Sequence, residues 1–261
     1  MKEQYSYKKK NIIQKIFIKI CRIFGYEIID QSNFFLPTQE KFLNENLSIQ
    51  GKKSIVLPLG EVKITRNVKA LTVIFRSCTK VNMLTQSKKR LFDENKSEYT
   101  FRSLNSLINS LNLAKQALEN INFDLIVIDH NSPEVDLEKM KKILTKSSFK
   151  NSIISLDINE FINNIKNINA KNQKVTENQK SNMSNIHKSL IFAKNNSKDL
   201  IYFVEDDYLH QKESIMEMIL TYERLSSQIK KELIICPADY PYLYTKLSST
   251  NIFLGNSRHW R

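Results

Sequence analysis

Short uninterrupted apolar runs alternate with segments of helical periodicity along most of this chain. The runs lie at 70–79, 123–132, 152–158, 199–207 and 233–236. An apolar run of about four to eight residues is typical of a strand that is buried on both faces of a sheet. When such strands alternate with helices, the connections are βαβ units. The pattern therefore predicts an α/β fold with a mostly parallel sheet.

The segments between the runs carry leucine, isoleucine and methionine at helical spacing. They predict helices over 99–118, 133–144, 184–194 and 213–227. Pro133 stands near the first turn of the second helix, where proline is favoured. The stretch 54–65 is expected to form two short strands around Leu59 and Gly60.

We expect two regions, an N-terminal helix with a connector (1–50) and a globular domain (51–261). The first region holds apolar residues at helical spacing with basic residues around them: Ile12, Ile13, Ile16, Phe17, Ile20, Ile23 and Phe24, and Lys8, Lys9, Lys10, Lys15, Lys19 and Arg22. Such a basic amphipathic helix predicts peripheral contact of residues 8–26 with an anionic membrane surface. Packing of the helix on the domain or on a partner is the alternative. No apolar run reaches the roughly 18 residues that span a bilayer, and lysines interrupt the apolar core that a cleaved signal peptide needs.

The net charge of +13 favours an anionic partner. The charge is not gathered into one tract and no nucleic-acid-binding signature is present, so we expect no nucleic-acid partner. Cys21, Cys78 and Cys236 are far apart, without a CxxC pair. They indicate a reducing compartment rather than a disulfide framework or a zinc site. We therefore expect a cytoplasmic protein, with any membrane contact on the inner face.

Polar residues follow three of the buried runs at the point where each run ends. The residues are Arg76, Ser77, Cys78 and Thr79 after the first run, Asp129 to Ser132 after the second, and Glu205, Asp206 and Asp207 after the fourth. In a parallel sheet the carboxyl ends of the strands share one edge, and ligands bind there. These residues are therefore expected to converge, although they are far apart in the sequence.

The three consecutive carboxylates need something to offset their repulsion. Along an extended chain Glu205 and Asp207 point to one side and Asp206 to the other. Two carboxylates at a strand end are hard oxygen ligands of the kind that Mg²⁺ and Mn²⁺ prefer, and those ions complete their shell with water and substrate phosphates. The alternative is a solvated acidic loop in which Asp207 caps the segment that follows.

The segments together resemble a GT-A fold glycosyltransferase of the family-two type. The matching parts are TVIFRSCTK, FRSLNSL, LIVIDHNSPE and KSLIFAKNNSKDLIYFVEDDYL, with EDD in the place of the DxD motif. The likeness covers about residues 71–236. It implies a three-layer Rossmann-like nucleotide-diphospho-sugar transferase fold, a nucleoside-diphosphate sugar as donor, and a divalent metal, Mn²⁺ or Mg²⁺.

The resemblance also implies roles for single residues. Arg76, Ser77, Cys78 and Thr79 fall at the wall of the nucleotide pocket, and Asp129 falls where the family contacts the base or ribose. Glu205 falls at the first DxD place, near the ribose and the metal, Asp206 is the middle residue beside the nucleotide sugar, and Asp207 is the metal ligand. Capping of the next helix is the alternative for Asp129, and a surface ion pair is the alternative for Arg76.

Two features depart from the family pattern. The usual Asp-Asp-Gly-Ser reads Asp-His-Asn-Ser here, and Asn131 is expected to replace the glycine because asparagine tolerates left-handed backbone geometry. Inverting members of the family generally supply a catalytic base from a segment beyond the fifth strand, and the resemblance makes Asp239, the only acid there, the candidate for it. His259 is a candidate third metal ligand or phosphate contact, and Trp260 is a candidate for stacking on a sugar. The acceptor-binding part is expected to be short, as in a C-terminally truncated enzyme.

The first hypothesis is a metal-dependent hexosyltransferase-like enzyme of cell-envelope polysaccharide synthesis, which moves a sugar to a glycan, a lipid-linked acceptor or another surface polymer. A nucleotidyltransferase is a second hypothesis, but the chain has no Gly-rich phosphate loop. A third is a non-catalytic basic protein that binds a membrane surface, including an inactive transferase. The donor, the acceptor, the stereochemical outcome and the oligomeric state are left open by the sequence.

Overall fold

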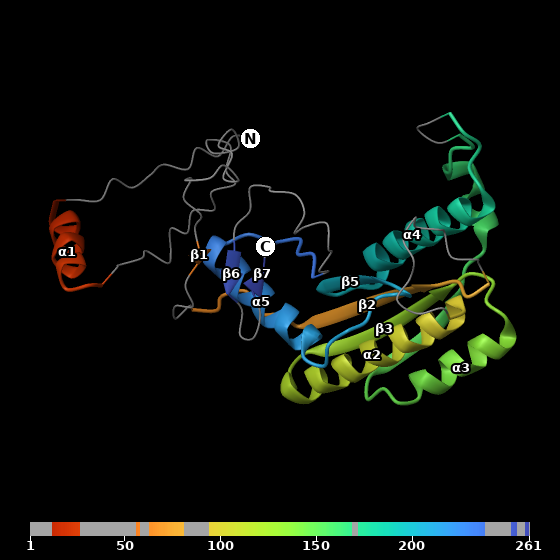
Figure 1. Cartoon of the computed structure of the whole chain (residues 1–261), viewed down its shortest axis with the longest axis horizontal. Coiled ribbons are helices and arrows are strands. Elements are labelled where there is room, and N and C mark those ends of the chain that lie inside the picture. The colour runs from red at the N-terminus through yellow and green to blue at the C-terminus, as the bar shows by residue number, and fades with distance from the viewer. Residues whose placement is uncertain are drawn as a thin grey trace.

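The computed structural model describes residues 12–26, 56–57, 63–80, 94–168, 172–237, 252–254 and 259–260. Its elements, shown in Figure 1, are α1 (Ile12–Ile23), β1 (Val56–Leu57), β2 (Ala70–Ser77), α2 (Lys96–Ala117), β3 (Asn122–Asp129), α3 (Glu134–Leu144), β4 (Lys150–Ser155), the 3₁₀ helix η3 (Ile158–Asn164), α4 (Glu177–Asn196), β5 (Leu200–Glu205), α5 (Ser214–Ile229), β6 (Ile252–Leu254) and β7 (His259–Trp260).

The main sheet has four strands in the order β4-β3-β2-β5, and all of its pairings are parallel. Successive strands β2, β3 and β4 step in one direction, and β5 then returns to the other side of β2. The order therefore reverses between β2 and β5, which is the place where open parallel sheets form a ligand crevice. The predicted α/β class with a parallel sheet is confirmed, and the strand order is consistent with a Rossmann-like fold.

One face of the sheet carries the larger core. Val73 and Phe75 of β2 and Val127 of β3 are buried there under leucines of α2, such as Leu104 and Leu107, and under residues of α3 and α5. The apolar residues of α2 recur every three or four positions, so they form the stripe that a helix needs to cover a sheet. Figure 1 shows α2, α3 and α5 on this side.

The opposite face carries a smaller core covered by α4 and η3. Ile74, Ile126 and Ile128 point to this side, where they meet Phe161 of η3 and Ala193 of α4. Small and polar residues of α4 lie buried against the strands, so this helix approaches the sheet closely. The described part of the domain is thus a three-layer α/β/α arrangement.

The ends of several elements follow from local chemistry. Thr176 and Gln179 form a capping box at the start of α4, which satisfies backbone donors left free in the first turn. Helix α4 therefore begins earlier than the predicted residue 184. Pro133 is the N-cap of α3, in line with its predicted place at the start of that helix. Asp157 caps η3, which the sequence pattern did not predict and which takes up the end of the third apolar run.

The predicted fifth strand at 233–236 is wrong. Residues 232–237 belong to no strand, although Leu233 and Ile235 pack partly against the larger core. The apolar run therefore serves one-sided packing rather than sheet pairing. The residue before it, Glu232, forms an ion pair of 2.7 Å with Arg66. In the 54–65 stretch, β1 is present, but residues 63–65 form no strand. A separate small sheet has the order β1-β6-β7.

The predicted N-terminal helix is present as α1. Figure 1 shows it apart from the sheet and the other helices. Among the described residues no helix has both the length and the apolar character needed to cross a bilayer. Cys21, Cys78 and Cys236 are all free thiols.

Candidate functional site

The carboxyl ends of β2, β3 and β5 meet at one edge of the main sheet, as predicted. Arg76 of β2 is in register with Glu205 of β5, and Ser77 is in register with Asp129 of β3. Residues more than 50 positions apart in the chain thus lie on neighbouring strands. The Arg76–Glu205 pair spans the point where the strand order reverses, and the Ser77–Asp129 pair lies beside it.

Asp129 is buried at this edge and is surrounded by donors. Its Oδ1 accepts hydrogen bonds from the hydroxyls of Ser77 and Ser132, both at 2.6 Å, and its Oδ2 accepts one from the backbone N–H of Ser132 at 3.1 Å. Because a buried carboxylate is costly unless it is hydrogen-bonded, these three donors explain how it is accommodated. The carboxylate links β2 to the turn after β3.

The turn after β3 contains one residue with left-handed backbone geometry. Asn131 has a φ of 55°, in the left-handed region that asparagine tolerates better than most residues. This confirms the left-handed geometry expected of Asn131. Ser132 also accepts a hydrogen bond from the backbone N–H of Thr79 at 3.0 Å, which ties the ends of β2 and β3 together. The Thr79 Oγ1 is buried with no partner among the described residues, so it is an unused donor at this edge.

Arg76 bridges the two sides of the strand-order reversal. Its guanidinium forms an ion pair with Glu205 and donates a hydrogen bond of 3.1 Å to the side chain of Asn182 in α4. The Arg76 side chain is mostly buried, whereas Glu205 is about half exposed. A fixed guanidinium with one accessible carboxylate partner is suited to exchange that partner for an incoming phosphate.

Asp206 serves a different purpose from its neighbours. Its side chain is buried, pairs with Lys96 of α2, and accepts a hydrogen bond of 2.9 Å from the Thr100 hydroxyl and one of 3.3 Å from the backbone N–H of Cys78. These contacts fasten the end of β5 to the start of α2 and to the end of β2. Lysine and arginine side chains thus offset two of the three carboxylates.

Asp207 is exposed and has no hydrogen bond or ion pair with the described residues. The alternation of exposed Glu205, buried Asp206 and exposed Asp207 follows the predicted two-sided pattern. Asp207 is therefore the carboxylate of the triplet that is open to a ligand, and Glu205 is next.

His130 and Ser181 connect the turn after β3 to α4. The His130 Nδ1 lies 2.7 Å from the Ser181 Oγ and 3.9 Å from the Cys78 Sγ. Burial lowers the pKa of His130, and the nearby Asp129 charge only partly opposes that shift. Burial thus favours the neutral imidazole, which can exchange a hydrogen bond without carrying charge.

A cleft of about 430 Å³ opens beside this turn. Its polar lining comes from the ends of β3 and β4, from η3 and from the first turn of α4: His130, Asn131, Ser155, Asp157, Asn159, Glu177 and Lys180. Its volume is within the range of small-molecule sites. Arg76 and the carboxylate triplet do not line it, so the described edge offers two adjoining regions rather than one enclosed pocket.

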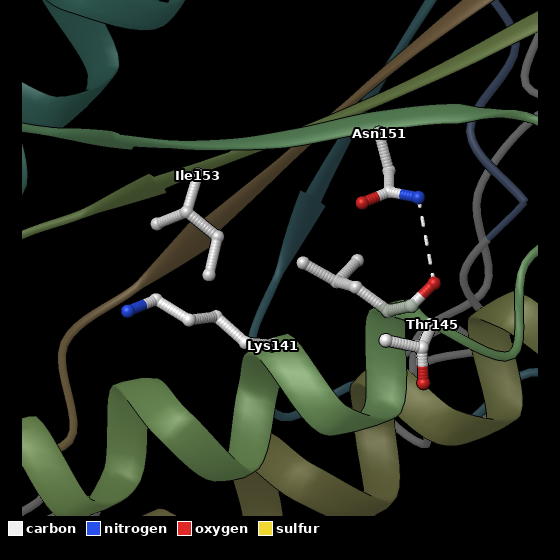
Figure 2. A pocket seen from close by; sticks show the side chains of 5 residues that line it. Lys141, Thr145, Asn151 and Ile153 are labelled. Atoms are coloured by element: carbon white, nitrogen blue, oxygen red, sulfur yellow. Dashed lines mark hydrogen bonds between the residues drawn. The ribbon is translucent and has the colours of Figure 1, made fainter.

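A second hollow, of about 330 Å³, lies between the end of α3 and the outer strand β4. Figure 2 shows Lys141 of α3 and Thr145, which follows that helix, on one side of the hollow, and Asn151 and Ile153 of β4 on the other. The Asn151 amide donates to the carbonyl of Leu144 at 3.4 Å. None of the predicted site residues lines this hollow. It carries no candidate chemistry.

The accessible carboxylates at this edge are suited to bind a hard divalent cation that takes only one or two protein ligands. Among the described residues, no three histidine, cysteine, aspartate or glutamate side chains gather into a metal cage. Magnesium-type ions bound to phosphates use only one or two carboxylates, so a cage is not required. Asp207 and Glu205 match that demand, whereas Asp206 is occupied by Lys96 and Thr100.

Two predicted residues are not brought to this edge by any described contact. Asp239 lies outside the described residues. His259 belongs to β7, where its backbone is in register with Leu254, and its side chain lies outside the description.

Sequence reasoning missed the polar partners that organise the edge. Lys96, Thr100, Ser181 and Asn182 come from the first two turns of α2 and α4. In a parallel sheet the helix that follows a strand begins near the carboxyl edge. Polar residues at the starts of the predicted helices could therefore have indicated these partners.

No model of a known protein family matches this chain, and no curated protein matches it.

Proposed function

We propose that this chain is a glycosyltransferase that binds a nucleoside-diphosphate sugar at the carboxyl edge of the main sheet. The observation that carries the proposal is the meeting of Arg76, Glu205 and exposed Asp207 at the strand-order reversal. This combination offers one cation and two reachable carboxylates for a diphosphate and its metal.

The diphosphate is expected to take the guanidinium of Arg76. A phosphate oxygen competes with Glu205 for the same N–H donors, and Glu205 is exposed enough to turn away. The released Glu205 carboxylate and Asp207 are then the residues that would hold Mn²⁺ or Mg²⁺. When bound, the cation neutralises charge on the departing diphosphate.

The nucleoside is expected to lie along the end of β3 and the adjoining cleft. Asp129 is supported as an anchor by its fixed position, while the unused Thr79 hydroxyl supplies a free donor. In the reaction an acceptor hydroxyl attacks the anomeric carbon, the bond from that carbon to the diphosphate oxygen breaks, and a base takes the hydroxyl proton. Asp239 is the sequence candidate for that base.

Binding calorimetry tests the proposal directly. UDP- and GDP-sugars are titrated into the full chain with and without Mn²⁺. We expect one nucleotide class to give metal-dependent heat, and Asp207→Asn to remove the metal-dependent part. Asp124→Asn is the matched control, because Asp124 lies near the amino end of β3.

The absence of metal-dependent heat with every nucleotide sugar would overturn the proposal. Release of pyrophosphate from a nucleoside triphosphate would instead indicate a nucleotidyltransferase. An Asp207→Asn variant that binds as the unaltered chain does would favour a non-catalytic protein.

A further inference from the structure

Helix α1 exposes a continuous apolar face. Ile12, Ile13 and Ile23 are 76%, 77% and 75% exposed, and Phe17 is 59% exposed. A helix of the described domain would normally bury such residues against the sheet. Figure 1 shows α1 away from that sheet, so this face is free for another surface.

Six apolar residues and two lysines of α1 occupy neighbouring sectors of the helix, whereas Ile18 lies outside the apolar sector. At 3.6 residues per turn, the isoleucines at 12, 13, 16, 20 and 23 and Phe17 fall within an arc of about 140°. Lys15 and Lys19 fall within about 60° of one border of that arc by the same count. Lysines at the border of an apolar face can keep their ammonium groups in water while their alkyl stems follow the apolar surface.

The charge around this helix has one sign. From residue 4 to residue 26 the sequence holds no aspartate or glutamate, and it holds six basic residues: Lys8, Lys9, Lys10, Lys15, Lys19 and Arg22. A protein partner with a purely apolar groove would gain nothing from this excess. An anionic lipid surface satisfies both features, because it presents hydrocarbon below a layer of negative headgroups.

The length of α1 decides how it would meet a bilayer. Its 12 residues extend over about 18 Å, whereas the hydrocarbon core is about 30 Å thick. The helix is therefore too short to span. It can lie in the plane of the interface with its apolar arc directed inward.

We infer that α1 is an interfacial anchor that binds the chain to an anionic bilayer. Its apolar arc enters the boundary between headgroups and acyl chains, and Lys15 and Lys19 contact the headgroups. This inference does not rest on the proposed enzymatic function, since it uses α1 and none of the residues at the sheet edge.

Vesicle co-sedimentation of the full chain provides the first test. Vesicles of phosphatidylcholine alone are compared with vesicles containing an equal share of phosphatidylglycerol. We expect binding only to the second kind, with a steep loss as salt rises. Lys15→Gln with Lys19→Gln should weaken binding about fivefold per lysine, and Phe17→Asp should abolish it. The matched controls are Lys142→Gln with Lys194→Gln, and Val135→Asp, because all three positions are exposed on α3 or α4.

Fluorescence tests the orientation of the helix. Trp260 is the single tryptophan, so a Trp260→Phe variant has no tryptophan fluorescence. In that background Phe17→Trp should shift to the blue on anionic vesicles, whereas Gln14→Trp, about 60° beyond the apolar arc by the helical count, should shift much less.

Three results would overturn the inference: equal binding to neutral and anionic vesicles, equal shifts of the two tryptophans, or no vesicle binding together with a dimer that Phe17→Asp converts to a monomer. The last result would make the apolar arc a contact between two copies of the chain. None of these results bears on nucleotide binding.

Discussion

Asp206 and Asp207 are neighbours in the chain, yet they lie in opposite environments. Only 11% of the Asp206 side chain and 13% of its partner Lys96 are exposed, whereas Asp207 is exposed. Removing one member of a buried ion pair leaves the other charged and unpaired, which is costly. We therefore expect Asp206→Asn to lower the free energy of unfolding by about 3 kcal/mol, and Asp207→Asn to change it by less than about 0.5 kcal/mol.

Urea unfolding of the two variants measures this difference. A second change, Lys96→Met, made together with Asp206→Asn, should recover part of the loss because no unpaired charge remains. If Asp206→Asn and Asp207→Asn lower the free energy of unfolding equally, the Asp206 carboxylate has no special role in stability.

The buried His210 is expected to make the free energy of unfolding depend on pH. Burial lowers the pKa of His210 to about 4 from 6.5, and its Nε2 lies 3.0 Å from the Tyr202 hydroxyl. Below pH 6.5 the His210 imidazole binds a proton in the unfolded chain but stays neutral in the folded chain. The free energy of unfolding therefore falls as the pH drops from 6.5 toward 4. Between about pH 7.5 and 5 the loss due to His210 should be about 2 kcal/mol.

Urea unfolding at the two pH values, with His210→Gln beside the unaltered chain, checks this expectation. The variant should lose most of the pH dependence in that window. The lowered pKa of His130 leaves a smaller remainder of the same sign. An unchanged pH dependence in the variant would rule out His210 as its source.

At the scale of elements, β2, β3 and β5 could be predicted because each is a nearly uninterrupted apolar run with few polar residues inside it. The run at 233–236 looks the same in sequence but forms no strand. Strand formation there depends on a pairing partner, and an apolar run carries no information about which neighbour is available.

For the candidate site, the sequence predicted which residues share an edge of the sheet but not which side chains pair there. A parallel sheet requires that Arg76, Asp129 and Glu205 share one edge, and they do. The pairing of Asp206 with Lys96 was not predictable, because Lys96 belongs to a basic segment in which no lysine differs from the next in sequence. Which cation reaches a carboxylate depends on helix placement within a few ångströms.

For the molecule as a whole, α1 and the α/β/α body are expected to be energetically independent. Six apolar residues of α1 remain largely exposed, so the helix buries little surface that would stabilise the body. The body instead depends on side chains such as Leu107, which is fully buried between α2 and the sheet. A deletion of residues 1–26 should therefore leave the free energy of unfolding within about 0.5 kcal/mol of the full chain.

Leu107→Ala in the full chain is the positive control and should cost about 2–5 kcal/mol, because it leaves a cavity in the larger core. Both variants are compared by urea unfolding followed by circular dichroism, and the slope with urea reports the surface exposed. If the deletion lowers stability as the control does, α1 packs on the body in solution. Its apolar arc is then a missing part of the core, and the two regions fold as one unit.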